Sequence, residues 1–306
     1  MRAIILASAK RPPAIARFLL SVLVVLAAYL LPGFVFGLVG FNPLGRALYA
    51  SVLLVLLLWG LTSLLFWLDR VRSPLLPAAG LPFGREALRD SSLGILIGAG
   101  SVSAVVGIVE LGGGVRFAYA GFHPAALLLG LWTLVAAAMV EEITFRGYPL
   151  HRLMEAVGTP AAVIATSCLF GLAHLHNPHA SALSAVNTAV IGVLLAVAYV
   201  RTRSLWVSWG IHFGWNLALG MGYGLVVSGF SDFSTAIVGR VQGPAWLTGG
   251  AYGIEASVTT TAVILTVLAV LLMLLRPRPA PEIIVRQDKP PRITPDPDQI
   301  PLRRIQ

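Results

Sequence analysis

Six polar residues interrupt apolar segments of this sequence, and their types and spacing suit hydrolytic chemistry. They fall in three motifs: Glu141, Glu142 and Arg146 in MVEEITFRGYPL, His174 at the end of FGLAH, and His212 and Asn216 in GIHFGWN. Ionisable side chains inside a membrane are unfavourable, so those that occur there usually mark a functional site. Carboxylates and imidazoles can activate a water molecule, and amide or imidazole groups can stabilise an oxyanion.

The two adjacent glutamates are expected to have different roles because they face different directions on a helix. Glu142 and Arg146 are four residues apart, so they share one face and can form a structural ion pair. Glu141 is rotated by about 100° from Glu142. We expect it to point into a cavity as a general base. The alternative is a helix end that carries interfacial charges.

The histidine motifs offer further polar groups. His212 and Asn216 share a helix face, so together they can donate hydrogen bonds to an oxyanion or to a polarised carbonyl. The alternative for this pair is a hydrogen bond between helices that stabilises the bundle. His174 is the third candidate. His176 and His179 in LHNPH could replace it, although Pro178 marks them as part of a loop.

Transmembrane helices are the elements that must position these residues. The chain has 306 residues, of which 57% are hydrophobic and only 11% charged. A soluble domain has about 25% charged residues, so the composition indicates an all-α, polytopic membrane protein. About eight apolar stretches approach the roughly 20 residues that cross a bilayer, and they lie near 18–40, 47–68, 91–111, 123–149, 160–175, 181–200, 204–229 and 254–275.

The basic residues predict the orientation of these helices. Lys and Arg gather before the first stretch and in every second loop, whereas the alternate loops hold only Arg46, Arg116 and Arg240. The positive-inside rule therefore places both termini in the cytoplasm. We expect a transmembrane domain over residues 1–275 and a disordered, Pro- and Arg-rich cytoplasmic tail over 276–306. No nucleic-acid partner is expected, because topology and anionic lipid account for the basic charge.

Helix geometry allows the depths of the polar residues to be compared. Glu141 lies about 14 Å from the cytoplasmic end of its stretch, and His212 lies about 12 Å from the same end of its own. His174 lies about 21 Å deep if the fifth stretch starts at Pro160. The three side chains are therefore expected to meet only if that stretch starts late, is tilted or is broken.

The three motifs, in this order, resemble those of the CPBP family, which comprises CAAX prenyl proteases and bacteriocin-processing enzymes, also called Abi proteins. EEITFR fits E-E-x-x-x-R, FGLAH fits F-x-x-x-H, and HFGWN fits H-x-x-x-N. The resemblance covers about residues 123–220. It implies an intramembrane endopeptidase, a hydrolase that cleaves membrane-embedded or lipid-modified protein substrates. It also leads us to expect a multi-pass protein of a prokaryotic plasma membrane.

Site roles follow from the resemblance by position. Glu141 would be the catalytic base that activates water, and His174 would help to hold that water. His212 and Asn216 would stabilise the oxyanion. The supporting acidic and basic positions would be Glu142 and Arg146.

A metal-dependent mechanism is the first alternative. Glu141, His174 and His212 form a His₂Glu set, which is known from catalytic zinc sites. The chain lacks H-E-x-x-H, so it is not of the zincin type. We favour a mechanism without a metal cofactor and keep zinc as the alternative.

Two other functions are also compatible with a polytopic chain. One is a transporter that relays protons through intramembrane carboxylates, although the sequence shows no pair of repeated halves. The other is a non-catalytic membrane immunity or scaffold protein. A variant lacking the Glu141 carboxylate would lose proton-coupled flux in the first case and keep its biological activity in the second.

Overall fold

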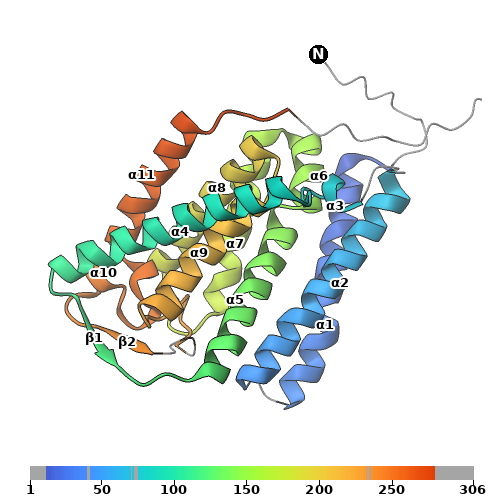
Figure 1. The fold of residues 1–306 in the computed structure, drawn as a ribbon. Helices are drawn as coiled ribbons and strands as arrows, with labels where there is room; N and C mark the ends of the chain where they lie inside the picture. The colour runs from blue at the N-terminus through green and yellow to red at the C-terminus, as the bar shows by residue number, and fades with distance from the viewer. Residues whose placement is uncertain are drawn as a thin grey trace, which may run out of the picture.

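The computed structural model describes residues 12–39, 42–69, 71, 75–231, 233 and 236–279, which are mostly helical (Figure 1). The α-helices are α1 (Ala14–Val39), α2 (Pro43–Asp69), α3 (Leu75–Ala78), α4 (Arg85–Leu111), α5 (Pro124–Phe145), α6 (Tyr148–Val157), α7 (Thr159–Ala173), α8 (Ala182–Thr202), α9 (Leu205–Asn216), α10 (Ala245–Thr248) and α11 (Val258–Leu274). The other elements are η1 (His174–His176), the π-helix η2 (Leu217–Gly222), η3 (Gly250–Tyr252), η4 (Ile254–Ala256), β1 (Val115–Tyr119) and β2 (Ile237–Val241).

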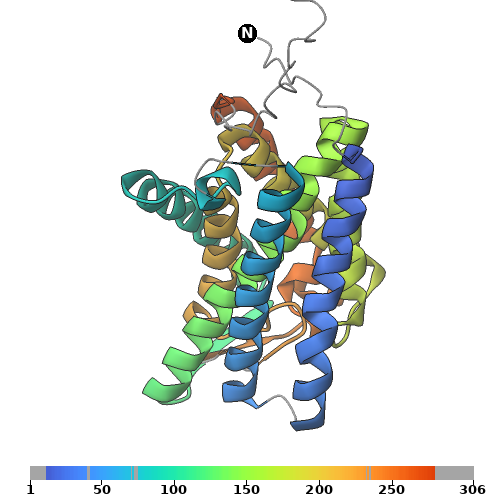
Figure 2. The same cartoon turned by 90° about the vertical axis from the view of Figure 1, so that its right-hand side faces the viewer.

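The long helices form one bundle with α1 and α2 at one side and α11 at the other (Figure 1). Helix α4 crosses the others at a steep angle, which the turned view also shows (Figure 2). Helices α5, α7, α8 and α9 fill the middle. One apolar core joins α4, α8, α9 and α11, and a second joins α1, α2, α5, α6, α7, α8 and the start of α9.

Each apolar stretch expected from the sequence contains a helix, but fewer of them qualify as membrane spans. Among the described residues, six helical segments are long and apolar enough to cross a membrane. They are α1, α2, α4, the segment of α5 and α6 together, the segment of α7 and η1 together, and α8. Helix α11 is too short, with 17 residues, and α9 has only 12 before the helix changes to π geometry. The count of eight spans and the side on which the termini lie stay predictions.

Two pairs of glycines bring α4 and α9 into direct backbone contact. A Cβ atom on Gly98 would lie 2.0 Å from the carbonyl oxygen of Ile211, and one on Gly94 would lie 2.4 Å from that of Val207. On α9, a Cβ on Gly214 would lie 2.5 Å from the carbonyl oxygen of Ile95. Small residues spaced by four allow membrane helices to approach this closely. This contact fixes the helix that carries His212.

A two-stranded antiparallel sheet lies at one end of the bundle and was not expected from the sequence. Strands β1 and β2 pair in the register Val115 with Val241 through Tyr119 with Ile237. The sheet connects the segment after α4 with the segment after η2. Strands this short, in segments with little periodicity, give a weak sequence signal.

The two segments expected to be loops at the opposite end are partly ordered. Arg85 and Arg89, expected in a connection, belong to the first turns of α4. Arg278, expected at the start of a disordered tail, donates hydrogen bonds of 2.6 and 2.9 Å to the two carboxylate oxygens of Asp90. The chain is therefore anchored as far as this residue. The rest of the predicted tail, 280–306, lies outside the described residues.

Candidate active site

Three helix segments bring the catalytic candidates together. Glu141 lies in the last turns of α5, His174 follows the last residue of α7, and His212 lies in the middle of α9. Helix α7 starts at a turn where Gly158 has φ +85°, a conformation that suits glycine, and Pro160 fits its first turn. The chain thus reverses direction between the two helices that carry Glu141 and His174.

Glu141 faces both imidazoles. Its Oε2 atom lies 3.8 Å from Nε2 of His174 and 3.7 Å from Nε2 of His212. These separations are too long for direct hydrogen bonds, and a single water oxygen can bridge such a gap. Within the described part of the chain, this buried oxygen has no hydrogen-bond partner.

The other ring nitrogen of each histidine is held by an acceptor. Nδ1 of His212 lies 3.0 Å from Oε1 of Glu142, and Nδ1 of His174 lies 2.8 Å from the carbonyl oxygen of Phe170. Because a carbonyl oxygen can only accept, the His174 ring must donate from Nδ1. Its Nε2 is then free to act toward Glu141. The same pattern orients His212, so both rings present Nε2 to one carboxylate.

Glu142 and Arg146 form the ion pair expected from their spacing. Arg146 Nη1 lies 3.2 Å from Glu142 Oε1, and the two residues are buried, at 1% and 0% exposed. Glu142 also accepts a short hydrogen bond from the Ser208 hydroxyl. Its carboxylate therefore contacts Arg146, Ser208 and His212, and it links α5 to α9.

Arg146 is enclosed by α7 and α8. Its guanidinium carbon lies 4.2 Å from the ring centroid of Phe170, which is cation–π distance. Its Nη2 atom donates to the carbonyl oxygen of Gly192 at 3.4 Å. The ion pair is therefore central to the packing of four helices. An exposed helix end would not bury these groups.

The depth mismatch noted from the sequence disappears because the fourth stretch is longer than expected. After a break at Arg146, the helix continues as α6 to Val157, where it turns into α7. Counted from this turn, Glu141 lies about 24 Å along α5 and α6, and His174 lies about 22 Å along α7. The two side chains reach one level without a late start or a break in α7.

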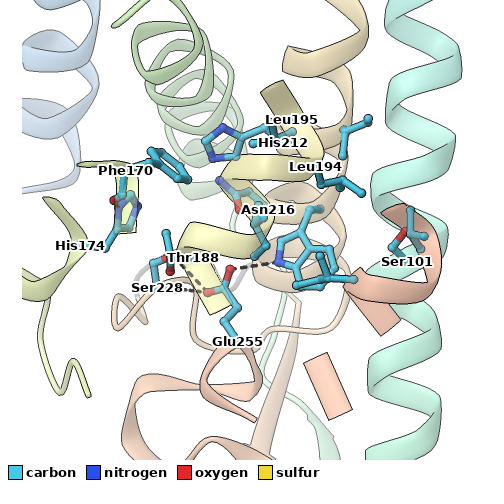
Figure 3. Close-up of a pocket in the computed structure, with 15 residues that line it drawn as sticks. Ser101, Phe170, His174, Thr188, Leu194, Leu195, His212, Asn216, Ser228 and Glu255 are labelled. Carbon is cyan, nitrogen blue, oxygen red and sulfur yellow. Dashed lines mark hydrogen bonds between the residues drawn. The ribbon is translucent and has the colours of Figure 1, made fainter. Parts of the chain in front are cut away.

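A pocket adjoins the two histidines (Figure 3). His174, His212 and Asn216 line it together with Phe170, Trp215 and Glu255. Asn216 points toward this pocket one turn beyond His212 (Figure 3). Glu141 is not part of the lining, in contrast to the cavity-facing position expected for it. The cavity open to water is about 30 Å³, which exceeds the roughly 10–15 Å³ that one water molecule needs.

Neither alternative histidine reaches this pocket. His176 and His179 are both exposed, and the lining does not include them. Two other residues were missed by the sequence analysis. Ser208 lies four residues before His212 on the same face of α9, and this spacing was a usable signal. Glu255 is a lone acid in the apolar run YGIEASV, which was also a signal.

The donor types at the site suit zinc, but their arrangement does not form a ligand set. Glu141, His174 and His212 supply one carboxylate and two imidazoles, and each imidazole is oriented through Nδ1 as metal ligands commonly are. Among the residues that the structure describes, no group of three or more His, Cys, Asp or Glu side chains is placed to hold a metal ion. The zinc alternative stays a prediction.

The helical bundle encloses a cluster of acidic and histidine side chains in helices of a membrane protein. Residues 123–218 match the family model of the type II CAAX prenyl endopeptidases, Rce1-like. The match covers less than a third of the chain, and it agrees with the CPBP family that the motifs resemble. The chain is thus an integral, multi-pass membrane protein that contains a region similar to the CAAX prenyl endopeptidases. No curated protein and no solved structure matches the chain.

Proposed function

We propose that this chain is an intramembrane endopeptidase in which Glu141 activates a water molecule held by His174. The proposal depends on one observation. The buried Oε2 atom of Glu141 lies within 3.8 Å of Nε2 of both His174 and His212, at distances that one bridging water can span. A carboxylate with this environment is well placed to take a proton from that water.

The reaction then proceeds by addition and elimination. The water oxygen bonds to the scissile carbonyl carbon while its proton passes to Glu141. The carbonyl oxygen becomes an oxyanion, which accepts hydrogen bonds from His212 and Asn216. When the carbon–nitrogen bond breaks, Glu141 returns the proton to the leaving amine. The products are a carboxylic acid and an amine, and no covalent enzyme intermediate is formed.

Glu142 supports this chemistry through His212. To donate from Nε2 while Nδ1 donates to Glu142, the His212 ring must carry both protons and a positive charge. The Glu142 carboxylate at 3.0 Å offsets that charge. Arg146 in turn keeps Glu142 ionised and in place. The ion pair therefore acts on the reaction by orienting one imidazole.

The conservative variant Glu141→Gln tests the base directly. A positioned general base contributes about 10²–10⁴-fold, so kcat should fall by that factor while the protein keeps its fold. The assay compares N-terminal and C-terminal peptide fragments of membranes that contain the wild type or the variant. Glu110→Gln, which changes an exposed glutamate at the end of α4, is the control and should cleave normally. Cleavage by Glu141→Gln at the wild-type rate would refute the proposal.

Two further measurements test whether the protein needs a metal ion and whether its substrate must be prenylated. Metal analysis of the purified protein, together with cleavage in the presence of a chelator, separates the metal-free mechanism from the zinc alternative. We expect the metal-free outcome, which is unchanged activity after chelation. Matched peptides with and without a C-terminal prenyl group then show whether lipid modification of the substrate is required.

A further inference from the structure

Glu255 is a buried acid that the proposed chemistry does not use. It lies in η4, beyond residues 123–218 that match the family model, and it is 5% exposed. Its side chain nevertheless lines the same pocket as His174, His212 and Asn216 (Figure 3). A buried acid in a membrane protein calls for a partner or a function.

Donors occupy both carboxylate oxygens of Glu255. Oε1 accepts a hydrogen bond of 3.0 Å from Nε1 of Trp215. Oε2 accepts one of 3.1 Å from the Ser228 hydroxyl and a shorter one from the Ser228 backbone N–H. A carboxylate engaged in this way is poorly placed to take a proton from water or to bind a substrate cation. Its contacts instead suit a positioning role.

The first contact fixes the end of α9. Trp215 lies three residues after His212 and directly before Asn216. The helix changes to π geometry at Leu217, so no regular α-helical turn follows to stabilise this end. The bond from Trp215 to Glu255 therefore holds the turn that carries both oxyanion candidates.

The second contact leads to His174. Ser228 has φ +48°, which is an unfavourable conformation for a residue with a side chain. Its carbonyl oxygen accepts a hydrogen bond of 3.0 Å from the Asn177 side chain, and the Asn177 backbone N–H donates to the carbonyl oxygen of His174 at 3.1 Å. The Glu255 carboxylate thus stabilises a strained residue that holds the turn after α7.

The backbone around Glu255 is itself held by α8. The side-chain amide of Asn187 donates to the carbonyl oxygens of Glu255 and Ser257, at 2.8 and 2.9 Å. The backbone of Glu255 and its carboxylate are therefore both held by hydrogen bonds. The side chain can thus fix the positions of Trp215 and Ser228 relative to each other.

We propose that Glu255 is a positioning residue that fixes His174 relative to the turn of α9 bearing His212 and Asn216. This inference rests on the proposed protease function. A displacement of about 1 Å at a reacting group can lower the rate about 10²-fold, so a residue that only sets this spacing can have a large effect on kcat. Its effect on KM should be small.

Glu255→Gln tests this role with little change in volume. A glutamine amide must oppose one N–H or O–H donor with its own NH₂ group, so at least one of the contacts is lost. We expect kcat to fall about 10- to 100-fold, with KM within about twofold of the wild type. Trp215→Phe removes the hydrogen bond to Glu255, and Asn177→Ala removes the one to Ser228. Each variant should lower kcat in the same way, so they test the proposal even if Glu255→Gln does not fold.

A double-mutant cycle separates positioning from general loss of stability. If Glu255 acts on His174 through Ser228 and Asn177, the double variant Glu255→Gln/Asn177→Ala should be no slower than the slower single variant. Effects on kcat that multiply would overturn the proposal, as would a wild-type kcat in Glu255→Gln.

Asp90→Asn is the matched control. Asp90 is also a buried acid, but it pairs with Arg278 near the start of α4 and does not line the pocket. This variant should lower the melting temperature and leave kcat unchanged. Glu141→Gln, assayed in parallel, separates the two proposals. If it is inactive while Glu255→Gln is normal, only the positioning role fails. If Glu141→Gln cleaves normally, the protease mechanism itself fails.

Discussion

Helices α4 and α9 touch through their backbones, whereas α1 and α2 touch through side chains, which are mostly apolar and include the ion pair of Arg17 and Asp69. In the first pair, added Cβ atoms on Gly94 and Gly98 would overlap carbonyl oxygens of α9. In the second pair, a Cβ on Gly60 would meet the Val24 side chain, at 2.7 Å. A groove of about 430 Å³, lined by tryptophan and aliphatic side chains, remains between α1 and α2.

The two helix contacts differ in how far the helices can shift relative to each other. A side chain can change its rotamer, whereas a backbone carbonyl moves only if its helix moves. The α4–α9 contact therefore sets the position of His212 within narrow limits. The α1–α2 contact buries apolar surface and leaves its geometry adjustable. Of these two contacts, the more rigid one lies beside the helix that carries His212.

The largest effect is expected from Glu142→Gln, beside the α4–α9 contact. Removing one member of a buried ion pair leaves Arg146 without its partner, which destabilises a protein by about 3–5 kcal/mol. Thermal unfolding in detergent should show this loss, and cleavage should disappear with it. Asp69→Asn is the comparison in α2, where Arg17 keeps Glu155 as a second partner at 2.7 Å. An equal loss from both variants would contradict the expected contrast.

Gly98→Ala should have the next largest effect. The new methyl group would lie 2.0 Å from the carbonyl oxygen of Ile211, the residue before His212, so α4 and α9 must separate. Overpacking of this kind destabilises by about 1–3 kcal/mol, and kcat should fall as His212 moves. Gly100→Ala in the same helix adds a methyl group that meets no other described part of the chain within 4 Å beyond its own helix backbone. It should leave both the melting temperature and kcat at or above wild-type values.

Ser208→Ala should have an intermediate effect. It removes one hydrogen bond to the Glu142 carboxylate, which keeps Arg146 and His212 as partners. A hydrogen bond to a charged group contributes about 1.5–3 kcal/mol, and the remaining partners place the expected loss at about 1.5 kcal/mol. Unfolding and kinetic measurements on one preparation would check it. A loss as large as that of Glu142→Gln would mean that Ser208, and not Arg146, holds the carboxylate.

Gly60→Ala should have the smallest effect. The new methyl group meets the end of the Val24 side chain, which can rotate away, and alanine favours the helix by roughly 0.5–1 kcal/mol. We expect a melting temperature within a few degrees of the wild type and unchanged cleavage. Destabilisation comparable to that of Gly98→Ala would show that α1 and α2 are packed as rigidly as α4 and α9.

Local spacing made much of the site predictable. Glu142 and Arg146 lie four residues apart, and this alone indicates their ion pair. The different orientation of Glu141, about 100° from Glu142, follows from the same helical period. The similar depths of Glu141 and His212 favoured their approach, whereas the approach of Glu141 to His174 was expected only from the resemblance to a family. Contacts between separate helices depend on packing, which the period of one helix does not encode.

The extension through α6, the α4–α9 contact and the bonds of Glu255 could not be predicted from residue spacing. The extension of the fourth span through α6 was missed because Gly147 and Pro149 resemble a helix end, yet the chain resumes a helix after them. The glycine pairs of α4 and α9 were visible as GILIG and GIHFG, but spacing alone does not name the partner helix. The bonds of Glu255 join four segments that are distant in the sequence, so no local pattern predicts them.

The small volume of the pocket has a consequence for turnover. If the proposed protease function holds, a cavity of this size would admit water and not a polypeptide, so neighbouring membrane proteins would be protected from hydrolysis. Each cycle would then begin when transmembrane segments part to admit the substrate. Gating of this kind often limits the overall rate of an enzyme, and here the thickness and fluidity of the surrounding lipid would influence it.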